Sequence, residues 1–181
     1  MRRVHEYSHL GGAEILASRF PDVAREIDEA IQAVQVTQKT KKSREKGKPG
    51  KLLYAPKEIN TKFKEEFAAR GYQELKHRYT IRIPDWPVEI KGSFKQIDFV
   101  KGRVLVEVQL GKYFAMFYDM AKLQYFYNQN EADVGVEIVP VNALKRQMSS
   151  GVGYGELLVY DMERLQRVFP TFPVKVIFID V

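Results

Sequence analysis

The sequence predicts an α/β fold in which a central mixed β-sheet is flanked by helices. Segments with helical periodicity alternate along the chain with short apolar segments typical of strands. In the middle of the chain the order is strand, strand, helix, strand, which favours a sheet with both antiparallel and parallel neighbours. The 181 residues are 45% hydrophobic, enough for a sizeable core, so we expect one domain over residues 1–181.

Two helices are predicted near the N-terminus, over residues 12–20 and 21–34. The second has Pro21 in its first turn, acidic residues early and apolar residues at helical spacing. We expect these helices to cover the sheet or to form a dimer face. Before them, His5 and His9 are spaced to bind a metal from one helical face, but no third ligand follows, so ordinary side chains are the favoured interpretation.

Residues 38–51 carry seven basic side chains and one acid without apolar periodicity, which predicts a mobile basic loop. By itself this loop is explained equally well as a solvated linker or as an arm that contacts phosphates. An amphipathic helix is predicted next, over residues 57–70, and Gly71 ends it. A strand over residues 72–83 follows, and the prolines after it stop the strand.

A β-hairpin is predicted over residues 96–109, turning at Lys101-Gly102. In the expected register Gln96 pairs with Glu107 and Asp98 pairs with Leu105. Five apolar residues then share one face, and four polar residues share the other. The apolar residues are Ile97, Phe99, Val104, Val106 and Val108, and the polar residues are Gln96, Asp98, Glu107 and Gln109.

Asp98 and Glu107 are diagonal neighbours in this register, about 7–8 Å apart at the backbone, so their carboxylates can converge on one cation. Hard oxygen ligands with open coordination positions suit Mg²⁺, which usually needs one or two carboxylates besides substrate phosphate. The alternative is a solvated hairpin face that carries two acids.

The C-terminal half predicts the remaining layers of the fold. A helix over residues 113–128 is expected to pack on the apolar face of the hairpin, and residues 134–139 predict a buried strand. The elements expected after it are a short helix at 141–147, a Gly-rich loop at 149–155, a helix at 156–168 and a closing strand at 174–181.

Composition excludes several kinds of chemistry. The chain has no cysteine, which removes disulfides, thiolate zinc sites and cysteine nucleophiles, and it has no Ser-His-Asp set. The formal charge of +6 weakly favours a polyanionic partner. No secretory h-region follows the basic N-terminus and no apolar run is long enough for a bilayer, so we expect a cytoplasmic protein without membrane contact.

The hairpin and several other stretches resemble a known family. Asp98 followed by Glu107-Val-Gln109 resembles the PD-(D/E)XK nuclease motif in the variant that ends in Gln. Further stretches are similar to Type II restriction endonucleases of the BglII and BstYI kind, and together they span nearly the whole chain. These stretches are Tyr7-Ser-His-Leu, Asp98-Phe-Val-Lys, Val106-Glu-Val-Gln-Leu-Gly-Lys-Tyr113, Asp133-Val-Gly-Val-Glu-Ile and Met148-Ser-Ser-Gly151.

This resemblance implies a restriction-endonuclease-like core and a magnesium-dependent enzyme, with Mn²⁺ able to substitute. Asp98 and Glu107 would be metal ligands, and Gln109 would orient the water that attacks the scissile phosphate. Glu14 is a further candidate acid for the metal site, since nucleases of this fold often place a helical acid near the metal, and a solvated helix residue is the alternative. Glu89, which precedes the hairpin, is another candidate, but no spacing argument fixes its place.

The resemblance also implies double-stranded DNA as substrate and a homodimer, because a palindromic duplex presents two equivalent scissile bonds to a two-fold axis. Lys112, Ser149 and Ser150 would read bases, within a site R-GATC-Y, or alternatively A-GATC-T, cut to leave four-base 5′ overhangs. The alternative for Lys112 is a helix-start residue that contacts a phosphate. Beside a nuclease site, the basic loop is better interpreted as a phosphate-binding arm, with contacts from Lys41, Lys42 and Arg44.

Two other functions remain open from the residues alone. A structure-specific or repair nuclease of the same fold would use the same three catalytic residues but has no obvious use for a base-reading loop at Ser149-Ser150-Gly151. A non-catalytic nucleic-acid-binding module has no need for Asp98 and Glu107 on one face, since two acids without a metal repel phosphate.

Overall fold

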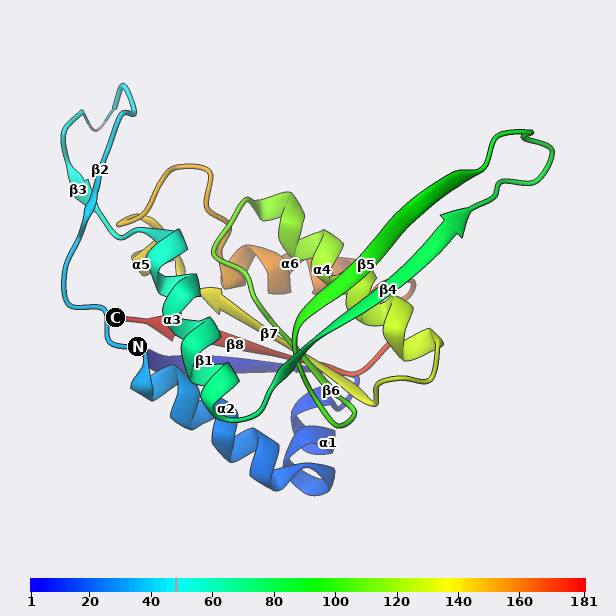
Figure 1. Cartoon of the computed structure of the whole chain (residues 1–181). Coiled ribbons are helices and arrows are strands. Elements are labelled where there is room, and N and C mark those ends of the chain that lie inside the picture. Colours follow the sequence, from blue (N-terminus) through cyan, green and yellow to red (C-terminus); the bar gives the residue numbers. More distant parts are fainter. Residues whose placement is uncertain (48) are drawn as a thin grey trace.

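The computed structural model describes residues 1–47 and 49–181, so one residue of the predicted basic loop lies outside the described part (Figure 1). Six strands form one sheet in the order β1-β8-β7-β6-β5-β4. Parallel pairing joins β6 to β7 and β7 to β8, while the other neighbours are antiparallel. The predicted mixed sheet is therefore confirmed. The strands are β1 (Arg2–His9), β4 (Gln73–Ile81), β5 (Ile90–Lys101), β6 (Val104–Val108), β7 (Val134–Pro140) and β8 (Val174–Asp180).

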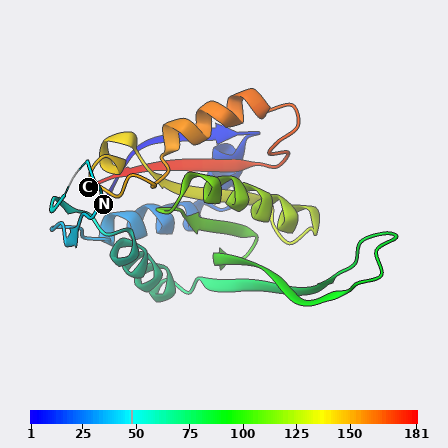
Figure 2. The same cartoon turned by 90° about the horizontal axis from the view of Figure 1, so that it is seen from above.

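Helices cover both faces of the sheet (Figure 2). One face packs against α1 (Gly12–Arg19), α2 (Pro21–Ala33) and α3 (Pro56–Ala69), with the short α5 (Asn142–Lys145) at its end. The other face packs against α4 (Tyr113–Asn128) and α6 (Gly155–Leu165). Across residues 1–47 and 49–181, no helix has both the length and the apolar character needed to cross a membrane.

Two segments differ from the predicted elements near the N-terminus. No element was predicted for residues Arg2–His9, which form the edge strand β1, so His5 and His9 do not share a helical face and the disfavoured metal-binding interpretation has no support. His9 is buried and its Nε2 lies 2.8 Å from the carbonyl oxygen of Pro170, whereas His5 packs edge-on against Phe178. The basic loop contains a small ladder of β2 (Lys41–Lys42) with β3 (Leu52–Leu53), so it is not wholly irregular, and its mobility stays a prediction.

The predicted register of the central hairpin is wrong. Lys101 pairs with Val104 and Phe99 with Val106, so the turn residues are Gly102 and Arg103. The first central position of a tight hairpin turn requires positive φ, which Gly102 adopts at 58° without steric cost. The paired part ends at Phe99 and Val106, so Asp98 and Glu107 are the next residues on the two strands and not the diagonal neighbours that were predicted.

A bulge in β5 also breaks the single apolar face that alternation predicts. Gln73 pairs with Val100, but Leu75 pairs with Ile97. An advance of two residues along β4 thus corresponds to three residues along β5, and the extra residue of β5 lies around Asp98. As a result Ile97 packs in the core under α4, while Phe99 packs under α2 and α3.

The strand β6 is buried on both faces, as its central position in the sheet requires. Val104, Val106 and Val108 pack toward α2 and α3. The helix α4 covers the opposite face, where Leu105 lies, so the prediction that residues 113–128 cover the valine face is wrong. This places α4 on the same side of β6 as Glu107 and Gln109.

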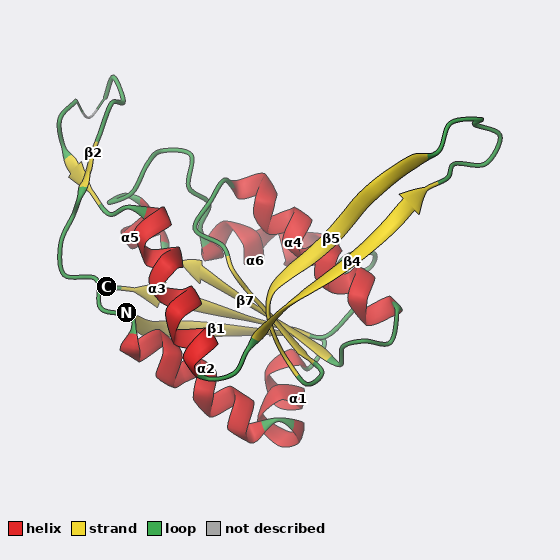
Figure 3. Cartoon of the chain, viewed as in Figure 1, coloured by secondary structure: helices red, strands yellow, loops and turns green. Residues whose placement is uncertain are grey.

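Beyond the body of the molecule, β4 and β5 continue as a two-stranded arm (Figure 3). Near its base, His77 and Tyr79 contact aromatic side chains of α4. Towards the tip no helix covers the arm in either view, and large apolar side chains including Ile83, Trp86 and Phe94 are exposed. The arm and the β2–β3 hairpin rise on the same side of the molecule (Figure 1).

Candidate active site

Glu107 is the buried centre of the predicted polar face. It lies near the end of β6 and is 3% exposed. Lys122 from α4 donates a hydrogen bond of 2.6 Å to Glu107 Oε1, and the same ammonium lies 2.8 Å from Asp119 Oδ1. Because α4 covers this face, Glu107 is not on a solvated hairpin surface, and the sequence did not predict these partners.

Gln109 is held at both ends of its amide. Its Nε2 donates to the Asp119 carboxylate, and its Oε1 accepts a hydrogen bond of 2.8 Å from the backbone N–H of Gly111. Glu107, Lys122, Asp119 and Gln109 thus form one continuous chain of polar contacts. The orientation of Gln109 is set by the protein itself, before any water or substrate arrives.

Burial controls the protonation of this cluster. Desolvation raises the pKa of Glu107 to about 8, although the Lys122 ammonium acts in the opposite direction. Desolvation likewise raises the pKa of Asp119. Glu137 on β7 is adjacent to Glu107 in the parallel register, is fully buried, and has no hydrogen-bond partner for either carboxylate oxygen. Burial and the nearby acids raise the pKa of Glu137 well above its usual value.

Asp98 lies beside this cluster in a groove of about 430 Å³ between α3 and the segment that follows β6. Its charge contributes to the raised pKa of Glu107, as expected for neighbouring carboxylates. Asn60 of α3 lines the same groove, and its Oδ1 is buried without a hydrogen-bond partner. Lys57, Lys64 and Gln109 also line the groove. The groove thus combines lysine ammonium groups with side-chain oxygen atoms that can bind a metal ion.

The donor set fits a divalent cation that takes few protein ligands. Asp98 and Glu107 supply hard oxygen atoms from adjacent strands. Within the described residues, no group of three or more His, Asp or Glu side chains is arranged to hold a metal ion by itself. A cation held here would draw its remaining ligands from water and substrate phosphate, the usual pattern for Mg²⁺.

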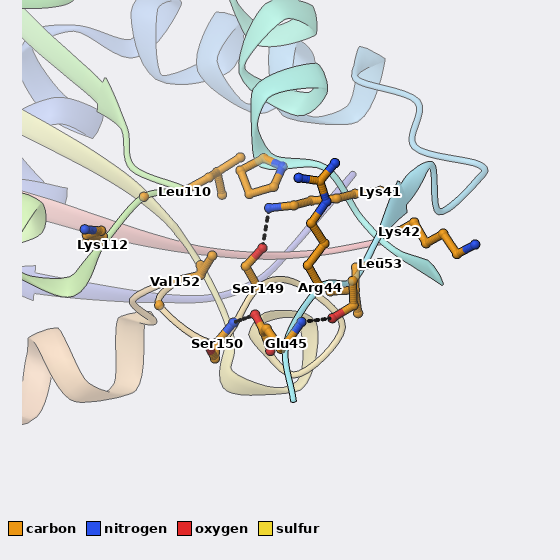
Figure 4. Close-up of a pocket in the computed structure, with 14 residues that line it drawn as sticks. Lys41, Lys42, Arg44, Glu45, Leu53, Leu110, Lys112, Ser149, Ser150 and Val152 are labelled. Atoms are coloured by element: carbon orange, nitrogen blue, oxygen red, sulfur yellow. Dashed lines mark hydrogen bonds between the residues drawn. The ribbon is translucent and has the colours of Figure 1, made fainter. Parts of the chain in front are cut away.

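A second hollow of about 820 Å³ adjoins this groove (Figure 4). It is lined by all six residues to which the sequence assigns DNA contacts: Lys41, Lys42, Arg44, Lys112, Ser149 and Ser150. Its loops are tied together. Lys41 Nζ donates to Ser149 Oγ at 2.5 Å, and the backbone N–H of Ser150 donates to the Glu45 carboxylate at 2.7 Å. The structure therefore brings the basic hairpin and the serine loop into one pocket.

The same hollow is tied to the strand that carries Glu107. Lys112 forms an isolated antiparallel bridge with Val152, and Gly153 donates from its backbone N–H to the carbonyl of Gly111 at 2.8 Å. Leu110 and Gly111 line both hollows. Leu110 and Gly111 therefore connect the groove that contains Asp98 and Gln109 with the pocket that contains Lys112.

Comparison with known proteins decides the family. Residues 4–179 match the family model described as "Restriction endonuclease BglII/BglIII". The chain belongs to this family. It is therefore a site-specific deoxyribonuclease, and restriction endonucleases of this kind generally use divalent metal ions.

Solved structures agree on the fold of this BglII-family endonuclease. The crystal structure of restriction endonuclease BglII complexed with a DNA 16-mer has a TM-score of 0.75 at 20% identity, covering 98% of this chain and 78% of the other. The crystal structure of free BglII has a TM-score of 0.69 at 17% identity, covering 98% and 79%. No curated protein sequence matches the chain.

Two further acids that were candidates for the metal site lie away from the active site of the endonuclease. Glu14 is exposed on α1, accepts a hydrogen bond from Ser8 of the edge strand β1, and lies near Lys175 of the neighbouring strand β8, whereas β5 and β6 lie further across the sheet. Glu89 pairs with Arg82 in the arm. Neither is brought to Asp98 and Glu107, so the structure does not support the tentative assignment of these acids to the metal site.

Four polar residues of the endonuclease were missed from the sequence: Asn60, Asp119, Lys122 and Glu137. Asp119 and Lys122 are three residues apart and are the only charged residues of α4, and Glu137 is the only acid in an apolar strand. A charged residue inside a buried element requires a partner or a function, so this was the available signal.

Proposed function

We propose that this restriction endonuclease hydrolyses double-stranded DNA at a palindromic GATC-centred site, R-GATC-Y, and leaves four-base 5′ overhangs. One observation carries the proposal: the groove with Asp98 and the pocket with Lys112 share Leu110 and Gly111 as lining residues. A phosphate in the groove would therefore adjoin bases that enter the pocket.

In this proposal Asp98 and Glu107 hold Mg²⁺, for which Mn²⁺ can substitute. The bound metal neutralises developing charge on the phosphate and lowers the pKa of its water. Gln109 lines the groove, and its Oε1 retains a lone pair beyond the bond from Gly111, so it can accept a hydrogen bond from the attacking water. Asp119 supports this role because it fixes the amide orientation.

Base reading is assigned to Lys112, Ser149 and Ser150. A lysine donor reaches guanine O6 or N7, which suits the central GATC. A serine hydroxyl can donate to N7 of either purine, which favours a degenerate outer pair over strict A-GATC-T. Lys41 donates a hydrogen bond to Ser149, so the basic hairpin lies beside the serine loop. We infer that Lys41, Lys42 and Arg44 contact phosphates that flank the bases read by this loop.

We further infer a homodimer, one domain over residues 1–181, and a basic segment at 38–51 that is mobile until DNA orders it. A cytoplasmic location follows from the DNA substrate. Sedimentation should give about twice the monomer mass, and a strict monomer on cognate DNA would contradict the dimer. The family assignment favours this function over a structure-specific nuclease or a non-catalytic module.

The cleavage test uses plasmid DNA and a randomised duplex library with Mg²⁺. Discrete fragments should appear, EDTA should abolish them, and sequenced ends should carry central GATC. Fragments without central GATC would overturn the site, whereas a unique outer pair would overturn only the serine assignment.

The matched variants are Asp98→Asn, which should abolish cutting, and Asp22→Asn on α2, which should not. Near-native cleavage by Asp98→Asn would show that the catalytic assignment is wrong. A variant at Glu107 is also needed, and Glu107→Ala would remove a buried side chain. Because Glu107 is buried against Lys122, Glu107→Gln is the better variant.

A further inference from the structure

Lys122 lies where a lysine is rarely found. Its side chain is 12% exposed, and its ammonium lies between two carboxylates whose side chains are each 4% exposed, at 2.6 Å from Glu107 and 2.8 Å from Asp119. No other lysine in the described residues has two acids from different elements this deeply buried around it. Lysine is almost never buried unless it is paired.

The two carboxylates depend on this lysine. Without the Lys122 ammonium, Glu107 and Asp119 would be two buried acids facing each other with no cation between them, and Glu137 and Asp98 are close by. Buried charges without a partner are strongly unfavourable. Lys122 therefore supplies the positive charge that a bound metal ion would otherwise supply.

The contact with Asp119 differs from the contact with Glu107. Asp119 and Lys122 are three residues apart on α4, so their pairing is local and survives movements of the lysine head group. The pairing with Glu107 crosses from helix to strand. The four-carbon stem of lysine is flexible, so the ammonium can give up one partner while it keeps the other.

We propose that Lys122 is a positioning residue: an internal counter-ion that holds Glu107 and Asp119 in the metal-free enzyme and yields Glu107 when a divalent cation binds. This inference rests on the proposed role of Glu107 as a metal ligand. After the exchange Lys122 remains with Asp119, and Asp119 continues to hold Gln109. The lysine thus keeps the water-orienting amide in place in both states.

The test measures Mn²⁺ binding to the DNA-free protein by electron paramagnetic resonance, together with thermal unfolding in EDTA and in Mn²⁺. Lys122→Met removes the competing charge but keeps the length of the stem. Compared at a pH at which Glu107 is ionised in both proteins, it should bind Mn²⁺ about tenfold or more tightly than the wild type, since a unit charge is removed from beside the cation. Its Tm should fall in EDTA and recover in Mn²⁺. Lys122→Arg should stay near the wild type.

A matched control is Lys101→Met. Lys101 pairs with Glu26 and donates to the carbonyl of Arg70. Its loss should lower the Tm in EDTA and in Mn²⁺ alike, without change in Mn²⁺ affinity. If Lys122→Met does not fold, Lys122→Met combined with Asp119→Asn is compared with Asp119→Asn alone, and tighter Mn²⁺ binding by the double variant is expected.

The outcomes separate this inference from the proposed function. Unchanged or weaker Mn²⁺ binding after loss of Lys122, or no measurable binding, overturns the counter-ion role. Glu107→Gln tests the metal site itself: if it binds Mn²⁺ as the wild type does, Glu107 is not a ligand and the proposed metal site fails. If Glu107→Gln loses Mn²⁺ but Lys122→Met does not gain affinity, only the role of Lys122 fails.

Discussion

Glu137→Gln should stabilise the protein at neutral pH. Glu137 is fully buried in β7 and neither of its carboxylate oxygens has a hydrogen-bond partner. Burial raises its pKa well above the ordinary value of 4.5, so the folded protein keeps this group protonated while the unfolded chain ionises it. Glutamine has nearly the same shape and is neutral at every pH.

The sign and size of the change in the free energy of unfolding follow from proton linkage. Where the folded state binds the extra proton, the free energy of unfolding falls by about 1.4 kcal/mol for each pH unit above the unfolded pKa. The penalty is absent below 4.5 and grows as pH rises towards the folded pKa. The advantage of Glu137→Gln over the wild type should therefore widen by up to about 3 kcal/mol between about pH 5 and pH 7.

The assay is urea unfolding followed by far-UV circular dichroism at several pH values. Fluorescence is unsuitable, because Trp86, the single tryptophan, is 63% exposed in the arm and reports little about the core. Glu65→Gln, an exposed change on α3, is the control and should give a constant difference. If the two stability curves of wild type and Glu137→Gln also run parallel over this range, Glu137 does not hold an extra proton in the fold, and the reasoning is refuted.

Three further changes have defined outcomes. Neutralising Lys41, Lys42 and Arg44 together should weaken binding to all DNA sequences and reduce the salt slope by up to about 0.9 for each lost phosphate contact; an unchanged slope in titrations would reduce the segment to a linker. Because burial raises the pKa of Glu107 to about 8, the Mg²⁺ concentration for half-maximal cleavage should fall as pH rises towards that value, by no more than about tenfold per unit, and a flat profile would contradict a protonated ligand. Gly12→Ala should destabilise the fold by about 2–3 kcal/mol in urea unfolding, since its Cβ would lie 2.3 Å from the backbone of β8; near-native stability would show that α1 can move away.

Local patterns in the sequence predicted most of the elements. Helical spacing located α2, α3 and α4 because one face of each is buried over several turns. The strand β1 was missed because its first five residues are exposed at the sheet edge, so no apolar alternation marks it. The hairpin register was misplaced because the choice between turns at 101–102 and 102–103 depends on where glycine takes positive φ.

The site could be predicted only in part, for a related reason. Asp98, Glu107 and Gln109 belong to one hairpin, so a motif of short range identifies them. The bulge at Asp98 and the contacts of Glu107 with α4 depend on how distant segments pack. No spacing rule along the chain encodes that Lys122 comes to lie against Glu107. DNA contacts were predicted separately for Lys41, from the basic loop, and for Ser149, from resemblance, but the sequence did not predict that these residues, which are 108 apart, line one pocket.

The arm formed by β4 and β5 divides the protein into regions of unequal local stability. At its base the ribbon has aromatic support from α4, through Tyr79 and Tyr125. At the tip of the arm each strand contacts only the other strand, and an isolated two-stranded ribbon has marginal stability in water. Amide protons near Ile81 and Ile90 should therefore exchange with solvent through local openings that leave the sheet intact, while those of β6 and β7 exchange only on global unfolding. The outer arm can thus be reshaped or lost during evolution at little thermodynamic cost to the catalytic body.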